Sequence, residues 1–387
     1  MNIHEFQAKA ILQSHGVPVL PGGIASNTTE AIAVARVTGG DAWMVKAQVH
    51  AGGRGKAGGV VKVTSPENAG AATEEMLGTR LVTAQTGPNG KEIKCIYIEK
   101  ACDIQTETYI AILVDRSSAQ VTFIASSQGG VEIEKSAGTI IRLPVNTASG
   151  LVEQEAADFA RQLGFDDDHS ILAVKTMQSM YSAFLDTDAS LIEINPLAVT
   201  KQGEVYALDV KMILDDNALF RHPELATLRD IDEVEPDELE AQRFELNFVR
   251  MQGDIGVMVT GAGLALATID IIKNHGGEAA DFMDVRPMAS REQVAAGIEM
   301  LLGNRKIESI MVNVMGGGIL RCDNIAEGVA LAWRNSTRHI PIIVRIAGTG
   351  KELAVLALNN QKIPVTFADD LNEAAKLAVQ AAKQGEA

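Results

Sequence analysis

The chain has 387 residues, of which 46% are hydrophobic and 22% charged, a composition that is ordinary for globular enzymes and a length that allows two or three domains. Its 34 Lys and Arg against 50 Asp and Glu give a formal net charge of −16, and no basic residues form a continuous stripe. Nucleic acid and anionic membranes are therefore poor partners, and any phosphate binding must depend on local groups.

The start of the chain and its cysteines bear on the cellular compartment. The first 17 residues have the apolar spacing of an amphipathic helix and lack the basic start and apolar core of a signal peptide. No segment approaches the roughly 20 apolar residues of a membrane span. There is no CxxC pair and no metal-ligand spacing among Cys95, Cys102 and Cys322. We therefore expect a protein of the reducing cytoplasm.

The first segment that indicates chemistry is residues 44–60, MVKAQVHAGGRGKAGGV. It combines a short strand bearing Lys46 with a loop that carries five glycines and Arg54. Glycines let backbone amides approach phosphate oxygens closely, and the two cations offset phosphate charge. A flexible surface hairpin is the alternative interpretation. The concentration of cations and glycines in an acidic chain favours a phosphate-binding loop.

Two strand pairs are predicted further along the first half of the chain. TYIAILVDR (108–116) and QVTFIAS (120–126) have the alternation of antiparallel strands joined by a short turn. LIEINPL (191–197) and the segment 206–221 place Asn195 and Asp209 on two neighbouring strands. Their oxygens could meet across a hairpin and hold Mg²⁺ that bridges nucleotide phosphates. Asn and Asp at strand ends also form turns, so both interpretations stay open.

From Asp254 onward, β-branched runs alternate with helical periodicities. The runs are IGVMV (255–259), DFMDV (281–285), SIMVNV (309–314), IPIIVRI (340–346) and IPVTFA (363–368). Five βα units in series predict a doubly wound parallel sheet, as in flavodoxin-like domains. The charged, proline-containing segment 218–247 predicts a linker with a helix. We therefore expect an α+β domain over residues 1–235 and a flavodoxin-like domain over residues 236–387.

Seven short motifs occur in one order along the chain: VHAGGRGKAGG, VDRSS, GGVEIE, EINPL, DDNALFR, GAGLA and RCDNIAEG. Together they resemble the β subunit of ADP-forming succinate–CoA ligases over essentially the whole chain. The resemblance implies an ATP-grasp domain to about residue 235, followed by a CoA-ligase domain.

The resemblance also implies which residues form the nucleotide site. The residues that would bind the phosphates of ATP are Lys46, Gly53, Arg54 and Gly55, and those that would line the adenine and ribose side are Glu99, Cys102 and Glu107. The Mg²⁺ ligands would be Asn195 and Asp209. Glu193 would contact the phosphohistidine when it docks at this site. Cys102 stands where relatives often carry a small hydroxyl residue, so its contact would be made through the backbone.

The reaction of this family implies a partner. An acid and ATP give an acyl phosphate, CoA displaces the phosphate, and the phosphoryl group travels on a histidine between steps. The resemblance assigns that histidine and the main CoA site to an α subunit, in an αβ or α2β2 assembly. None of the seven histidines here lies in a glycine-rich phosphohistidine loop of that kind, and His50, in the phosphate loop, is expected to be structural or to contact nucleotide.

Three loops of the C-terminal domain depart from the succinate-specific pattern. VTGAG carries a threonine where relatives have asparagine, Arg-Pro-Met at 286–288 replaces three glycines, and VMGGGILRCD is one residue longer. In open α/β sheets, ligands bind at the loops beyond the carboxyl ends of the strands. The residues expected to contact the acid are Thr260, Arg286, Gly318, Ile319 and Leu320.

The identity of the acid follows from these loops. Replacing three glycines by Arg-Pro-Met stiffens the loop and adds a cation suited to an oxyanion, which favours sulfoacetate or malate over succinate. Loop drift in a succinate enzyme is the alternative. A nucleotide-binding regulator without catalysis is a further alternative. The retained Glu193, Asn195 and Asp209 argue against it.

Overall fold

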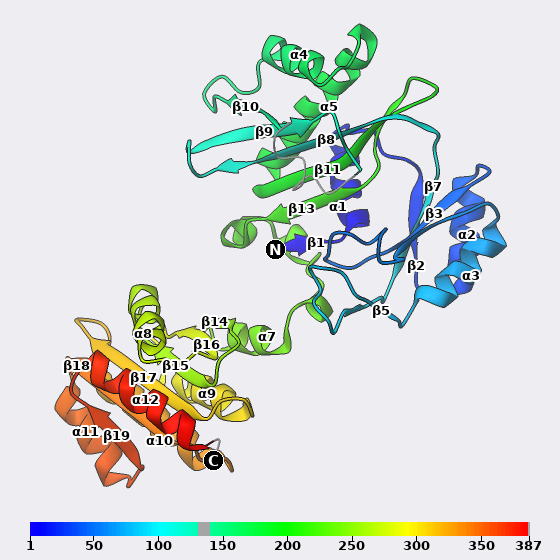
Figure 1. The fold of residues 1–387 in the computed structure, drawn as a ribbon. Helices are drawn as coiled ribbons and strands as arrows, with labels where there is room; N and C mark the ends of the chain where they lie inside the picture. Colours follow the sequence, from blue (N-terminus) through cyan, green and yellow to red (C-terminus); the bar gives the residue numbers. More distant parts are fainter. Residues whose placement is uncertain (131–139, 386–387) are drawn as a thin grey trace. The chain divides into compact units, whose positions relative to one another are not determined.

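The computed structural model describes residues 1–130 and 140–385, so the motif GGVEIE lies partly outside the described residues. The chain divides into two compact units, Met1–Glu233 and Val234–Ala387 (Figure 1). No helix among the described residues has the length and apolar composition of a membrane-spanning segment.

The larger sheet of the first unit is antiparallel, in the order β1-β13-β11-β8-β9-β10, with β12 paired to β11 (Figure 1). Its strands are β1 (Asn2–Ile3), β8 (Ile104–Asp115), β9 (Gln120–Ser126), β10 (Ile141–Val145), β11 (Ala189–Thr200), β12 (Val205–Ala207) and β13 (Val210–Leu214). The predicted hairpin is confirmed as β8 and β9, with Ile112 opposite Phe123.

Three helices pack on one face of this sheet: α1 (Glu5–Ser14), α4 (Glu153–Gln162) and α5 (Asp167–Asp186). Strand alternation brings Ile112 and Ile192, which are register partners, to the same buried face. Leu12 of α1 and Met177 of α5 pack into the same core. The helix expected at the start of the chain is confirmed, although it begins only at Glu5, after β1.

A second, smaller antiparallel sheet carries the predicted phosphate loop, in the order β2-β7-β3-β4. Its strands are β2 (Gly22–Ala25), β3 (Trp43–Ala47), β4 (Val60–Val63) and β7 (Ile96–Lys100), and a separate ribbon pairs β5 (Arg80–Leu81) with β6 (Lys91–Glu92). The helices α2 (Thr28–Thr38) and α3 (Pro66–Met76) begin at the side-chain caps Asn27 and Ser65. The glycine-rich loop joins β3 to β4.

The segment predicted as a linker with one helix, all of it described, contains several short helical pieces. These are η2 (Asp216–Arg221), α6 (Pro223–Ala226), η3 (Ile231–Glu233) and α7 (Pro236–Arg243). Proline stands at the start of α6 and of α7, where its missing N–H is tolerated.

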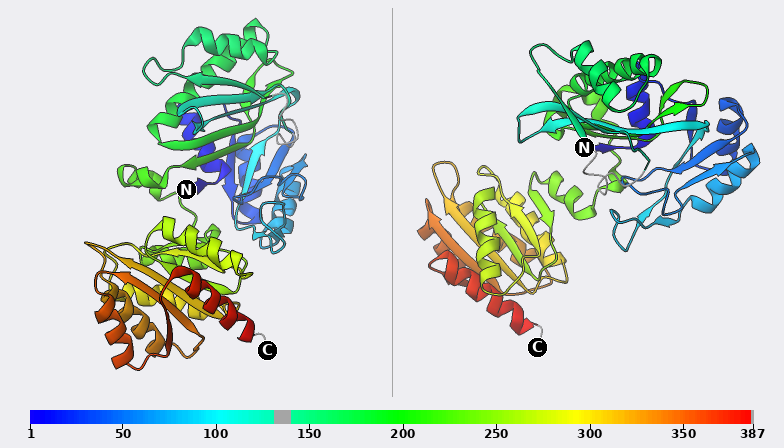
Figure 2. Two further views of the ribbon diagram at one scale, coloured as in Figure 1. Left: turned by 60° about the vertical axis from the view of Figure 1, so that its left-hand side comes forward. Right: turned by 45° about the horizontal axis from the view of Figure 1, so that its top comes forward.

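The second unit contains a six-stranded sheet in the order β14-β16-β15-β17-β18-β19. Two further views show its strands together with the helices that surround them (Figure 2). Its strands are β14 (Asn247–Arg250), β15 (Ile255–Val259), β16 (Asp281–Asp284), β17 (Ser309–Gly316), β18 (Ile342–Gly348) and β19 (Val365–Ala368). The helices are α8 (Ala262–Asn274), α9 (Arg291–Gly303), α10 (Cys322–Asn335), α11 (Lys351–Asn360) and α12 (Leu371–Gly385). One apolar core gathers α9, α10 and α11 on one face, and another gathers α8 and α12.

The five predicted parallel strands are confirmed, but the sheet is not wholly parallel. β14 pairs antiparallel with β16, with Phe248 opposite Met283. This strand, which begins at the last residue of the predicted linker and precedes the first predicted run, was not predicted, because its side chains are mostly exposed and show no buried β-branched run. An exposed edge strand carries little of the hydrophobic pattern on which the prediction depended.

Candidate nucleotide and acid sites

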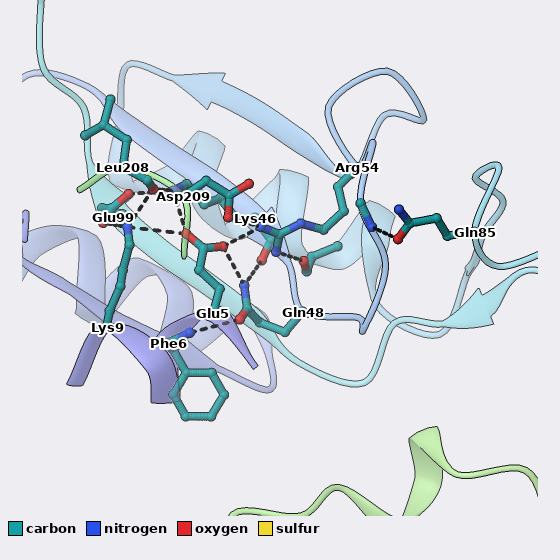
Figure 3. Close-up of polar contacts among 12 residues, drawn as sticks. Glu5, Phe6, Lys9, Lys46, Gln48, Arg54, Gln85, Glu99, Leu208 and Asp209 are labelled. Carbon is teal, nitrogen blue, oxygen red and sulfur yellow. Dashed lines mark hydrogen bonds and ion pairs between the residues drawn. The ribbon is translucent and has the colours of Figure 1, made fainter. Parts of the chain in front are cut away.

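Lys46 and Arg54, the two cations of the predicted phosphate loop, meet at one buried carboxylate (Figure 3). Lys46 lies on β3, and its Nζ donates to Glu5 Oε1 at 2.8 Å and to Glu99 Oε2 at 2.6 Å. Arg54 Nη2 donates to Glu5 Oε2 and to Asp209 Oδ1, at 2.7 Å each. The Lys46 and Arg54 side chains are only 7% and 8% exposed.

A sixth side chain, Lys9 of α1, completes the arrangement. Its Nζ donates to Glu99 Oε1 and, at 2.7 Å, to the carbonyl of Leu208. We define the buried charge cluster as Glu5, Lys9, Lys46, Arg54, Glu99 and Asp209. Its three carboxylates balance its three cations, so ionic partners offset much of the desolvation penalty.

The charge states of the cluster follow from these contacts. Burial acts to lower the pKa of Lys46, but Glu5 and Glu99 outweigh it and raise that pKa above its ordinary value. Burial acts to raise the pKa of Glu5, yet Lys46 and Arg54 hold it well below its usual range. The pKa of Lys9 is lowered by burial and by the neighbouring Lys46. Lys46 and Glu5 are therefore both ionised at neutral pH.

The glycine-rich loop leaves open space beside Arg54. Gly53 has a φ of 76°, in the left-handed region that favours glycine. A Cβ added at Gly53 or Gly55 would meet nothing within 4 Å, and both residues are exposed. Between them, the Arg54 side chain turns inward, and its Nη1 donates to Ala47 O at 2.8 Å. The backbone of this loop is thus accessible to a phosphate group.

Asn195 and Asp209 lie opposite each other, as predicted. The backbone N–H of Asn195 donates to the backbone carbonyl of Asp209 at 3.0 Å. The side-chain oxygen of Asn195, Oδ1, accepts from Gly130 N at 2.7 Å. Glu193, two residues earlier on β11, accepts from the hydroxyl of Tyr109 at 3.4 Å. Burial, with Glu193 beside it, raises the pKa of Tyr109 above its ordinary value.

The Asn195 and Asp209 oxygens fit Mg²⁺ in kind, since this ion prefers carboxylate and amide oxygens. Across the described residues, no three His, Cys, Asp or Glu side chains gather as a metal site. Two protein oxygens suit an ion that is held jointly with nucleotide phosphates and water.

The residues expected on the adenine and ribose side have different surroundings. Glu99 is 1% exposed, and its carboxylate points into the buried charge cluster (Figure 3). Cys102 is half-buried after β7, and burial raises the pKa of its thiol. Glu107 lies on β8 opposite Ala198, where its carbonyl accepts from Gly129 N at 3.0 Å. The Glu99 carboxylate is thus occupied by Lys9 and Lys46, and a contact with the adenine would be made through other atoms of this residue.

His50, at the start of the glycine-rich loop, packs against His4, with 4.4 Å between the ring centroids. His4 Nε2 is 2.7 Å from Asp230 Oδ2. Burial, with His4 beside it, lowers the pKa of His50 to about 4, so its ring is neutral at pH 7. This packing favours the structural role over contact with nucleotide.

The predicted acid-contacting residues Thr260 and Arg286 follow β15 and β16. Thr260 Oγ1 accepts from Met315 N at 3.1 Å, which ties this loop to the end of β17. Arg286 Nη1 lies 3.0 Å from Glu245 Oε2, and the two side chains are 55% and 62% exposed. An ion pair this exposed is weak, so Glu245 holds Arg286 loosely.

The loop after β17 lies beside a shallow hollow of ≈ 300 Å³, whose lining includes Met288, Ile319 and Arg321. Ile319 is 70% exposed and Met288 85%. A Cβ at Gly318 would meet nothing within 4 Å. The side chain of Leu320 is buried in the core, so the expected contact between Leu320 and the acid would be made through its backbone.

Arg345 is a charged residue in this unit that the sequence analysis did not single out. It lies on β18 opposite Asn313 of β17, and its Nη1 donates to Asn313 Oδ1 at 3.3 Å. Asn313, which is fully buried, donates in turn to Thr268 Oγ1 at 2.8 Å. The Arg345 Nε is buried without a hydrogen-bond partner. The sequence feature that could have marked Arg345 is its position as the one charged residue in the otherwise apolar run IPIIVRI.

Comparison with known proteins agrees with this architecture. The ATP-grasp domain family matches residues 2–199, and the CoA-ligase family matches residues 258–379. The chain is 44% identical to the succinate–CoA ligase [ADP-forming] subunit beta of Bdellovibrio bacteriovorus, over 99% of this chain and 100% of the relative. Its identity to the subunit of the same name from Nautilia profundicola is 46%, over 99% of both chains.

A solved structure shares the fold over nearly the whole length. The ATP citrate lyase of Methanothrix soehngenii superimposes with a TM-score of 0.77 at 18% sequence identity, over 98% of this chain and 99% of that one. An identity this low speaks for the fold alone. With two matching domain families and full-length relatives at 44–46% identity, the chain belongs to the β-subunit family of ADP-forming succinate–CoA ligases.

Proposed function

We propose that this chain is the ATP-binding subunit of an acid–CoA ligase that converts an acid, CoA and ATP into acyl-CoA, ADP and phosphate. The observation that carries the proposal is the buried charge cluster beside the glycine-rich loop. Its Lys46 and Arg54 are fixed next to accessible backbone, while Asp209 is 48% exposed. Fixed cations beside the accessible backbone of Gly53 and Gly55 suit the phosphates of a nucleotide.

Each part of the proposed nucleotide site has a distinct task. Lys46 and Arg54 offset phosphate charge, and the amides around Gly53 and Gly55 hydrogen-bond phosphate oxygens. The backbone near Cys102 and the Glu107 carboxylate line the adenine and ribose side.

Asn195 and Asp209 are the proposed Mg²⁺ ligands. When bound, Mg²⁺ would neutralise charge on the phosphates and favour phosphoryl transfer. Arg54 pairs with Asp209 Oδ1 at 2.7 Å, so Mg²⁺ would bind through Oδ2 or take the place of Arg54 at Oδ1.

The proposed reaction needs a second subunit. The relatives are named β subunits, and no histidine of this chain lies in a glycine-rich phosphohistidine loop. An α subunit, in an αβ or α2β2 assembly, would supply the phosphohistidine and the main CoA site. Glu193, held near Tyr109, would steady the phosphohistidine at the nucleotide site.

We propose a small acid other than succinate as substrate, with sulfoacetate and malate as candidates. Arg286 supports this choice, since it is more than half exposed and has only a weak ion pair with Glu245. It is therefore free to pair with an anionic group remote from the reacting carboxylate. Succinate is the second candidate because the relatives carry its name.

An acid panel tests this proposal. The chain and its α subunit are assembled and assayed with succinate, malate and sulfoacetate, and the panel is repeated with Arg286→Gly. Losing a charge-assisted contact raises the KM of the preferred acid about ten- to a hundredfold and leaves the KM for ATP unchanged. Arg305→Gly, an exposed arginine at the opposite ends of the strands, is the matched control. Succinate as the best substrate, with kinetics unaffected by Arg286→Gly, would refute the assignment of the acid.

A further inference from the structure

Glu5 is a buried carboxylate that uses both oxygens on cations of the proposed phosphate site. Oε1 accepts from Lys46 Nζ at 2.8 Å, and Oε2 accepts from Arg54 Nη2 at 2.7 Å (Figure 3). Lys9 Nζ lies 3.3 Å from Oε1, and Gln48 Nε2 donates to Oε2 at 3.4 Å. The Glu5 side chain is 2% exposed. It is therefore placed to act on other residues and not on a ligand directly.

Glu5 also connects parts of the first unit that belong to different sheets. Its helix, α1, packs into the core of the larger sheet through Ala8 and Leu12. Lys46 lies in the smaller sheet, and Arg54 lies in the loop between β3 and β4. One carboxylate from outside the smaller sheet thus fixes two cations that β3 and its loop supply.

Electrostatics explain why such a bridge is needed. Two cations that face one phosphate-binding loop repel each other, and both are largely removed from water. A carboxylate between them lowers that repulsion and sets their separation. Arg54 can then exchange Asp209 for a phosphate without moving far, because its bond to Glu5 is independent of Asp209.

We propose that Glu5 is a positioning residue of the nucleotide site, which holds Lys46 and Arg54 as a pair for the phosphates of Mg-ATP. The inference rests on the proposed nucleotide site. It assigns a role in that site to the first helix of the chain.

The test compares two variants that differ only at Glu5. Lys9→Met is the reference, and its cluster has one negative charge more than that of the wild type. Lys9→Met combined with Glu5→Gln restores the neutral balance, so electrostatics alone would favour phosphate binding in the double variant, and a loss there reports on positioning. Binding of Mg-ATP, AMP and adenosine to the full chain is measured by calorimetry. We expect about tenfold weaker Mg-ATP binding in the double variant, a smaller loss for AMP and none for adenosine.

The dependence on phosphate number separates positioning from mere structural support. Equal losses for adenosine and Mg-ATP, or unchanged Mg-ATP binding in a folded double variant, would overturn the inference. If the double variant does not fold, Glu5→Asp decides the question. It keeps the charge but is one methylene shorter, so its carboxylate is drawn back from Lys46 and Arg54, and an Mg-ATP affinity equal to wild type overturns the inference. Wild-type chain that binds no Mg-ATP would instead refute the proposed function.

Discussion

Asp209 is the exposed member of the buried charge cluster, with 48% of its side chain accessible. Replacing it by Asn removes the anionic ligand for Mg²⁺ and leaves the fold intact, because the side chain lies at the surface. We predict at least about a hundredfold loss of turnover in the assembled enzyme, with little change in melting temperature. Asp168→Asn, an exposed carboxylate on α5, is the matched control. Wild-type turnover of the Asp209 variant at limiting Mg²⁺ would show that the metal assignment is wrong.

Some individual residues of the site could be predicted from the sequence, and others could not. Lys46 and Arg54 stood out because cations among glycines are rare in an acidic chain. Glu5 and Lys9 did not, because charged residues four apart on an amphipathic helix are the usual pattern of an exposed surface. Their burial depends on Lys46, Arg54 and Glu99, which are distant in sequence. No local pattern contains that information.

Among the strands, β16 begins with a buried carboxylate that is expected to lower the stability of the folded protein at neutral pH. Asp281 is 1% exposed; its Oδ1 accepts from Val257 N of β15 at 2.9 Å, and its Oδ2 has no hydrogen-bond partner. Burial raises the pKa of Asp281 well above its ordinary value. The unfolded chain therefore releases this proton at a lower pH than the folded protein does, and Asp281 lowers stability as pH rises above its ordinary pKa.

We predict that Asp281→Asn stabilises the protein at pH 7 by on the order of 1 kcal/mol, because the amide keeps the acceptor for Val257 N and cannot ionise. Below the ordinary pKa of aspartate the two proteins should be nearly equal in stability, since the native side chain is then protonated in both states. Chemical unfolding between pH 3 and pH 8 measures this difference, because the range includes pH values below the ordinary pKa of aspartate. A variant less stable than wild type at pH 7 would contradict the prediction.

The elements themselves were predictable where burial produces a regular pattern. The β8–β9 hairpin and the five parallel strands of the second unit follow from alternation and from β-branched runs between helices. β14 escaped prediction because an exposed edge strand lacks that pattern. The burial of Leu320 was not predicted either, because the sequence of its loop does not indicate that one side chain turns into the core.

For the whole molecule, the missing nucleophile is decisive. We predict that the purified chain binds Mg-ATP but forms no CoA ester until its α subunit is added. The reason is that the proposed nucleotide groups are present while no glycine-rich phosphohistidine loop is found. Product formation is measured for the chain, the α subunit and their mixture. Substantial CoA-ester formation by the chain alone would disprove the requirement.

The first residues of the chain complete their contacts with some of the last residues of the first unit. Asn2 pairs with Ile213, and Glu5 shares Arg54 with Asp209. During synthesis, α1 therefore leaves the ribosome long before residues 209–214 have been made. Until then, the charged side chains of α1 that are buried in the folded unit stay hydrated. Nucleotide affinity should appear only after residue 214 has emerged, which makes it a late event in translation and a marker of a completed first unit.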